Sequence, residues 1–305
     1  MPSLNSADPS SNRLGSSIAI LVMAHTEPEL LDRLITRLSA SFDVYLHLDK
    51  AAPYSLSDFS WSSRVSPVTR RRTYWGAFAV TEAILDLLST AHHHHYDHYV
   101  LISGQDVPLK SNSNITKFFS DNRDKDFIRT IKMPHPGIQG GMERLTRSYW
   151  HAFYRYSGLR RWGYQVVEFL LAAGYRTVLQ EKILSGDFYH GETWFSLRHQ
   201  TVENLFSYLA QHPEYSRIFT HSRLAEEIFP HSVIRRLNSE ARDIEDTTTF
   251  VDWDTGPESP RVLDETDAER LGARWELFAR KVALPKSALL VDCLYERTDE
   301  QSSPR

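Results

Sequence analysis

The chain has 305 residues, of which 41% are hydrophobic and 24% charged, a composition that supports a sizeable core and excludes a disordered protein. Its 35 Lys and Arg against 39 Asp and Glu give a formal net charge of −4, which excludes nucleic acid as a partner bound by bulk charge. The single cysteine, Cys293, excludes a disulfide framework and a cysteine-rich zinc site, and it favours a reducing compartment.

Both ends of the chain are polar. Residues 1–16 are rich in Ser, Pro and Asn, which predicts a disordered tail without the apolar stretch of a secretory signal. The apolar run 18–24 is too short to span a bilayer, and 298–305 is predicted to fray. We therefore expect a cytoplasmic protein. Peripheral contact with the inner face of a membrane stays open, because aromatic and basic residues cluster in the middle of the chain.

Strand and helix patterns alternate from residue 17 onward. The segments 18–24, 43–50 and 98–104 are short and apolar, as is typical of buried parallel strands, and 27–40, 73–91 and 112–122 have helical spacing. We expect a strand at 126–132, mostly helix over 143–181, and a strand running into a helix over 192–213. The segment 222–237 predicts a helix, 247–253 a strand and 267–282 a long helix. Together they predict one α/β domain over 17–297, with a nucleotide-binding half to about 130 and an acceptor and catalytic half over 131–297.

Two acidic residues follow predicted strands directly, Asp49 in LDK and Asp106 in SGQDVPL. Ligands of doubly wound sheets bind at the carboxyl ends of strands. Either residue alone is explained as well by a turn or a helix cap, but two at one edge favour a ligand site. The chain has no Walker A loop, GxGxxG, GxSxG or HExxH motif, and the run 92–95 of four histidines is most simply a solvated loop.

The second half of the chain adds an acidic pair, an indole and several cations. Glu226 and Glu227 lie at a predicted helix start. An acidic residue there is also explained by its favourable interaction with the helix dipole. Trp253 at a strand end is either a core residue or a platform for a sugar ring. Arg261 and Lys281 are either solvated or bind an anion such as diphosphate.

In this order, these motifs resemble the core-2/I-branching β-1,6-N-acetylglucosaminyltransferases, a family (glycosyltransferase family 14) that also holds the protein O-xylosyltransferases. The matching segments span 18–282 and are ILVMAHTEPELLDRL, VYLHLDK, YWGAFAVTEAILDLL, YVLISGQDVPLKSN, YHGETWFSLRHQTV, LAEEIF, TFVDW and LFARKV. The resemblance implies a GT-A fold, with a Rossmann-like mixed sheet flanked by helices. It also implies a UDP-sugar donor, inversion at the anomeric carbon, and no metal or other cofactor. The missing disulfide cysteines of the animal enzymes favour a bacterial-type member.

The resemblance also assigns roles residue by residue. Glu227 matches the catalytic base, although the first member of its acidic pair is Glu where the family has Asp. The nucleotide-sugar positions are Met23, His25, Asp49, Asp106, Arg261 and Lys281, with Arg235, Arg236 and Arg280 as alternatives to Arg261. The acceptor positions are Arg129, Arg144, Trp194 and Trp253. Arg129 stands where the mucin-branching enzymes have an acceptor-contacting Glu, which leaves the acceptor open.

The resemblance favours transfer of N-acetylglucosamine from its UDP-sugar to a hydroxyl of a glycan or lipid-linked glycan. A transferase that uses UDP-xylose, UDP-glucose or UDP-glucuronate is the first alternative, because a few pocket contacts decide the donor. A non-catalytic carbohydrate-binding protein is the second. A metal-dependent enzyme that uses the histidine run is the third.

Overall fold

The computed structural model describes residues 17–146, 186–238, 240, 243–256 and 260–300, together with 149, 162, 163 and 166. The predicted tail 1–16, residues 301–305 and most of the aromatic and basic stretch 143–181 lie outside the described residues.

The described chain is built on a seven-stranded sheet with the order β10-β6-β9-β4-β1-β2-β3. At its centre β1 pairs in parallel with β2 and β4, and β9 runs antiparallel to β4. The central strands are buried almost throughout because helices cover both of their faces, which explains their continuous apolar runs. The strands are β1 (Ile18–Ala24), β2 (Asp43–Leu48), β3 (Val65–Pro67), β4 (His98–Ser103), β6 (Asp126–Phe127), β9 (Ser196–Arg198) and β10 (Ile244–Glu245).

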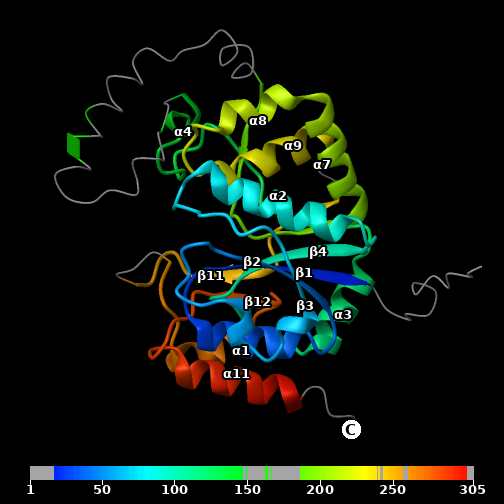
Figure 1. Ribbon diagram of the computed structural model, residues 1–305, viewed down its shortest axis with the longest axis vertical. Helices are drawn as coiled ribbons and strands as arrows, with labels where there is room; N and C mark the ends of the chain where they lie inside the picture. The colour runs from blue at the N-terminus through cyan, green and yellow to red at the C-terminus, as the bar shows by residue number, and fades with distance from the viewer. Residues whose placement is uncertain are drawn as a thin grey trace, which may run out of the picture.

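Helices form a layer on each face of this sheet (Figure 1). One layer shares a large hydrophobic cluster with the sheet and contains α2 (Phe78–His92), α7 (His199–Gln211), α8 (Pro213–Phe219) and α9 (Phe229–Leu237), with the short α4 (Glu143–Thr146) near its edge. The opposite layer contains α1 (Pro28–Leu38), α3 (Asn112–Asp121) and α11 (Ala288–Glu300). The sheet and its two helical layers confirm the predicted α/β fold of GT-A type.

Two small sheets complete the fold. In one, β12 (Phe278–Arg280) pairs in parallel with β11 (Thr249–Val251) and antiparallel with β5 (Val107–Pro108). In the other, β7 (Ile131–Lys132) pairs with β8 (Tyr189–His190). Short helical turns are η1 (Leu56–Asp58), η2 (Ser62–Arg64), η4 (Ala225–Glu227), η5 (Glu265–Asp267) and α10 (Ala268–Gly272).

The prediction of one long helix over 267–282 is wrong. Helix α10 ends at Gly272, and the buried run that follows it, Leu277 to Ala279, contributes to strand β12. This run is apolar at consecutive positions, is fully buried, and pairs with strands on both sides, so sheet pairing overrides its helical propensity.

Two further predicted elements are divided. The segment 222–237 splits into η4 and α9, because Pro230 favours a new helix start after Ile228. The segment 126–132 splits into β6 and β7, which belong to different sheets.

The sequence analysis missed helix α11. Its buried residues Leu290, Val291, Leu294 and Thr298 recur at helical spacing, which is the signal that would have found it. The helix continues to Glu300, into the segment expected to fray. Across the described part of the chain, no helix combines the length and the hydropathy that crossing a bilayer requires.

Candidate active site

The carboxyl ends of the central strands open into a cavity of ≈ 660 Å³. Because β1, β2 and β4 are parallel, the segments that follow them meet at one edge of the sheet. Because β9 is antiparallel, the segment that precedes it lies at the same edge. The segments that follow β11 and β12 also reach the cavity. Seven of the predicted site residues line the cavity, namely Met23, His25, Asp49, Trp194, Glu227, Trp253 and Lys281.

Glu227 ends the turn η4 and is the most constrained carboxylate of the cavity. Its Oε2 lies 2.5 Å from Nη1 of the buried Arg144 and 3.1 Å from Nε2 of His190. Burial would raise the pKa of Glu227, but the hydrogen bond from His190 and the charge of Arg144 outweigh it and hold the pKa below its ordinary value. Glu227 is therefore ionised at neutral pH, the state that a general base needs.

A glycine fixes the loop that carries His190. The backbone N–H of Gly191 donates to the Glu227 carbonyl at 2.9 Å, which ties the β8–β9 loop to η4. A Cβ at Gly191 would collide with the Arg129 carbonyl oxygen and the His231 ring. Only glycine permits this close approach, so it sets the position of His190 against Glu227.

Glu226, the neighbour of Glu227, has the opposite electrostatic character. It is 5% exposed, lines the same cavity, and its Oε2 is buried without a hydrogen-bond partner in the described chain. Burial, together with the adjacent charge of Glu227, raises the pKa of Glu226 to about 8. One carboxyl of the pair is thus ionised near neutral pH while the other is protonated, although both belong to the same turn.

Two consecutive cations lie at the end of β12. The Arg280 guanidinium is 4.0 Å above the Trp194 ring and 3.5 Å from the fully buried Asp106, and burial lowers its pKa. Asp106 thus lies behind the cavity wall, where burial raises its pKa to about 6. Lys281 lines the cavity and makes no ion pair with the described chain, and both cations act electrostatically on His25.

The carboxyl ends of β1 and β2 and the residues after them form another part of the wall. Asp49 is 3% exposed and accepts hydrogen bonds from the backbone N–H groups of Ala51 at 2.6 Å and Thr73 at 2.7 Å. Burial would raise the pKa of Asp49, but these bonds and the Thr73 hydroxyl lower it. Burial lowers the pKa of His25, so a neutral ring faces the cavity beside Met23.

A carboxylate that the sequence analysis did not single out joins two of the predicted acceptor residues. Glu192, in the β8–β9 loop, accepts a hydrogen bond at Oε1 from Trp253 Nε1 at 3.0 Å and from Arg129 Nη1 at 3.5 Å. Arg129 also lies 3.8 Å from Asp246. Trp253 is 44% exposed at the cavity rim.

Arg261 is held beside the cavity by acidic side chains. Its Nη1 lies 2.9 Å from Asp267 and 3.7 Å from Asp252, and its Nη2 lies 3.3 Å from Asp264. Asp252 also accepts hydrogen bonds from the Thr255 hydroxyl at 2.6 Å and from Arg270 at 2.7 Å, which overcome the effect of burial and lower its pKa. Asp252 thus serves this ion-pair network, and Arg261 is absent from the described cavity lining.

The histidine run lies outside this cavity. His92 ends α2 and stacks on His199 at 4.6 Å, and His95 Nδ1 lies 3.0 Å from His199 Nε2. Within the residues that the structure describes, no group of three or more His, Cys, Asp or Glu side chains has an arrangement that could hold a metal ion.

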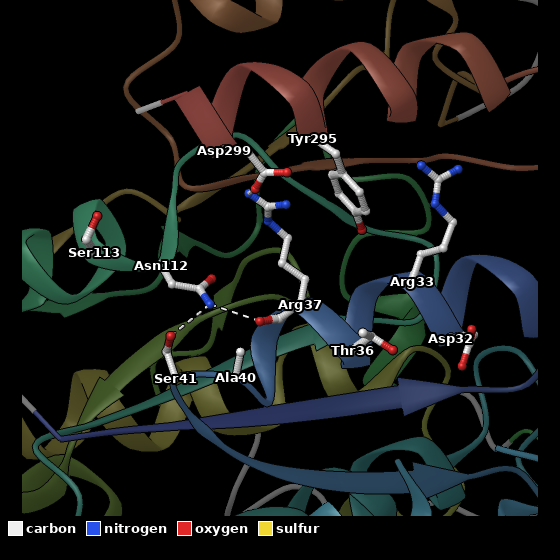
Figure 2. Close-up of a pocket in the computed structure, with 10 residues that line it drawn as sticks. All are labelled: Asp32, Arg33, Thr36, Arg37, Ala40, Ser41, Asn112, Ser113, Tyr295 and Asp299. Atoms are coloured by element: carbon white, nitrogen blue, oxygen red, sulfur yellow. Dashed lines mark hydrogen bonds and ion pairs between the residues drawn. The ribbon is translucent and has the colours of Figure 1, made fainter. Parts of the chain in front are cut away.

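A second cavity, of ≈ 650 Å³, lies between α1, α11 and the start of α3 (Figure 2). Its cations are already paired, since Arg33 lies 2.6 Å from Asp292 and Arg37 lies 2.7 Å from Asp299. Both guanidinium groups also lie over the Tyr295 ring. These contacts hold α11 against α1 and leave neither arginine of this cavity free to bind an anionic leaving group, so we place the chemistry in the first cavity.

Comparison with known proteins identifies the family of the chain. The family described as Core-2/I-Branching enzyme matches residues 18–273. The chain belongs to this family of glycosyltransferases. Xylosyltransferase 2 of Rattus norvegicus is 25% identical over 203 residues, which cover 62% of this chain and 21% of that protein. Xylosyltransferase 2 of Mus musculus is 23% identical over 222 residues, which cover 68% of this chain and 23% of that protein. This chain therefore spans only about a fifth of the length of these relatives.

Sequence reasoning missed His190 and Glu192 and weighed Arg280 only as an alternative to Arg261. All three lie in segments that the resemblance to the Core-2/I-branching family already matched, YHGETW and LFARKV. The usable signal was Gly191 between two polar residues just before a buried strand. Which of these side chains faces the cavity depends on strand pairing, which the segments do not specify.

The raised pKa of Glu226 predicts a stability change with pH. Between the ordinary glutamate pKa and about 8, the folded protein holds a proton that the unfolded chain has released, so stability falls as pH rises. His231, whose pKa burial lowers to about 3, acts in the opposite sense only below about pH 6.5. Between about pH 6.5 and 8, we therefore expect the free energy of unfolding to fall by up to about 2 kcal/mol through Glu226.

Chemical unfolding at both pH values measures this change. Glu226→Gln cannot titrate and should lose most of the decline, whereas Glu245→Gln, at an exposed position on β10, should keep it. An equal decline in Glu226→Gln and the parent protein would contradict the assignment.

Proposed function

We propose that this protein is an inverting glycosyltransferase that moves a sugar, preferably N-acetylglucosamine, from a UDP-sugar to a hydroxyl of a glycan acceptor. The observation that carries the proposal is the arrangement around Glu227. An ionised, partly buried carboxylate faces a cavity at the carboxyl edge of the sheet, and Lys281, a cation without an ion-pair partner in the described chain, lines the same cavity. This is a base beside a site for an anionic leaving group.

The reaction proposed for this geometry is a single displacement. The acceptor hydroxyl oxygen forms a bond to the anomeric carbon, while the bond from that carbon to the diphosphate breaks and UDP leaves with the electron pair. Glu227 takes the hydroxyl proton. Because Arg144 and His190 both contact Oε2, we assign proton acceptance to Oε1. General-base assistance of this kind contributes about 10²- to 10⁴-fold in rate.

Lys281 and Arg280 are the proposed partners of the diphosphate. Lys281 has no competing carboxylate in the described chain, and Arg280 is stacked on Trp194 at one end of the wall. Fixed cations that face the leaving group stabilise the charge that grows on it, without reorganising during the reaction. We therefore propose that the enzyme needs no metal ion or other cofactor.

Arg261, which the sequence analysis paired with Lys281 for the diphosphate, is less accessible than Lys281 and Arg280. It would have to exchange part of its contact with Asp264 and Asp267 for a phosphate. We retain it as a third ligand that acts after such an exchange, with Asp49, His25 and Met23 on the uridine side of the cavity. Asp106 acts indirectly, through its ion pair with Arg280.

We also propose which donor sugar and which acceptor the enzyme uses. UDP-xylose is the principal alternative donor, since both similar rodent proteins are named as xylosyltransferases. UDP-glucose and UDP-glucuronate follow. We propose a glycan or lipid-linked glycan as the acceptor and a cytoplasmic site of action, at the inner face of a membrane where the acceptor is lipid-linked. Donor hydrolysis measured with these four UDP-sugars separates the donors. UDP binding without turnover of any donor would instead indicate a non-catalytic carbohydrate-binding protein.

Glu227→Gln tests the base directly. The substitution keeps the size of the side chain and removes the proton-accepting carboxylate, so kcat should fall about 10²-fold or more. UDP affinity should persist, which shows that the variant is folded. The exposed Glu245→Gln is the matched control and should keep its rate. A kcat for Glu227→Gln close to that of the control would remove Glu227 from the mechanism.

Activity should survive chelation. Protein incubated with EDTA and assayed without added metal is expected to retain most of its rate, because protein cations face the leaving group. Complete loss of activity that Mn²⁺ restores would refute the proposed diphosphate site and would favour a metal-dependent enzyme.

Lys281→Ala should weaken UDP binding far more than uridine binding. A charged hydrogen bond to phosphate contributes about 1.5–3 kcal/mol, so the loss of UDP affinity should be roughly ten- to a hundredfold. Calorimetric titration of both ligands measures it. Lys286→Ala, which removes an exposed lysine near Asp264, is the control. Arg261→Ala should show the same selectivity if Arg261 reaches the diphosphate, whereas equal losses for UDP and uridine in Lys281→Ala would assign Lys281 to the fold.

A further inference from the structure

The acceptor side of the cavity contains a carboxylate with no role in the reaction proposed above. Glu192 has a side chain that is 13% exposed, and it lines the cavity. Its Oε1 accepts hydrogen bonds from Trp253 and Arg129, whereas its Oε2 is buried without a hydrogen-bond partner in the described chain. A buried carboxylate oxygen without a donor is costly, and the cost is relieved when a ligand supplies an O–H group.

The contact with Trp253 gives Glu192 a second consequence. An indole has one N–H donor, and here Glu192 holds it at 3.0 Å. The hydrogen bond fixes one edge of the ring, while the side chain stays 44% exposed at the rim of the cavity. A fixed, exposed aromatic face beside a carboxylate suits a sugar ring, whose C–H groups project from the ring face and whose equatorial hydroxyl groups project from its edge.

The charges around this rim are unevenly matched. Arg129 faces two carboxylates, Glu192 at 3.5 Å and Asp246 at 3.8 Å. Arg280 is the other cation that acts on Glu192, and it is already engaged by Asp106. Three carboxylates on this side, Glu192, Asp246 and Asp106, thus face two cations, Arg129 and Arg280, which leaves one negative charge without a matching cation. An acidic sugar would meet repulsion here, and an uncharged one would not.

We propose that Glu192 is an acceptor-binding residue that orients Trp253 and accepts a hydrogen bond from a hydroxyl of an uncharged acceptor sugar. The inference rests on the proposed glycosyltransferase function and deepens it, because it names the class of acceptor. It differs from the role of Glu227, since Glu192 takes no proton and contacts the acceptor away from the reacting hydroxyl.

A kinetic comparison of Glu192→Gln with the parent protein tests the proposal. UDP release is measured with neutral methyl glycosides of glucose, galactose, xylose and N-acetylglucosamine, and with the methyl glycosides of glucuronate and galacturonate. In the parent protein the neutral glycosides should accelerate UDP release and the uronides should not. In Glu192→Gln the acceptor KM should rise about ten- to a hundredfold, well beyond any change in the donor KM or in the acceptor-free hydrolysis of donor. Glu245→Gln should change none of these values.

A double-mutant cycle separates direct binding from a general loss of structure. If Glu192 acts partly through the indole, the effects of Glu192→Gln and Trp253→Phe on acceptor KM should not add. The proposal is overturned if uronides serve the parent protein as well as their neutral counterparts, or if the acceptor KM of Glu192→Gln stays within about twofold of the parent value. The absence of any donor turnover in the parent protein would instead refute the proposed function itself.

Discussion

The parallel pairing of β1 with β2 and β4 is the constraint on which the site depends. It directs three carboxyl ends to one edge of the sheet, and it requires helices on both faces because the strands are apolar on both sides. The antiparallel β9 then delivers the β8–β9 loop to the same edge. With other strand directions, His25, Asp49 and Glu192 would lie at different edges of the sheet and would not line one cavity.

The electrostatics of the cavity follow from what each side chain meets there. Glu226 and Glu227 are neighbours in one turn, yet of these two carboxylates it is Glu227 that Arg144 and His190 contact. The pKa of Glu227 is therefore lowered while that of Glu226 is raised. Separation of two carboxyl pKa values by environment is how a site obtains one base and one neutral acid at the same pH.

The cavity lining combines groups that suit different ligands. It contains Lys281, a cation without a carboxylate partner in the described chain, and also Glu192 and Trp253, which are joined by a hydrogen bond. An anionic leaving group suits the first of these, and an uncharged sugar suits the second. Arg261 contributes less to the charge of the cavity, because it forms ion pairs with the neighbouring Asp264 and Asp267.

The sequence by itself determined the α/β class, the family and the segments that form the site, because short buried strands and helical spacing are local properties. It also singled out Glu227 and Lys281 through ordered motifs. Only the tertiary structure decided that 278–280 forms a strand, that Arg144 contacts Glu227, and that Glu192 contacts Trp253. Each of these is a contact between residues far apart in the chain, and such contacts depend on strand pairing and burial, which no local pattern specifies.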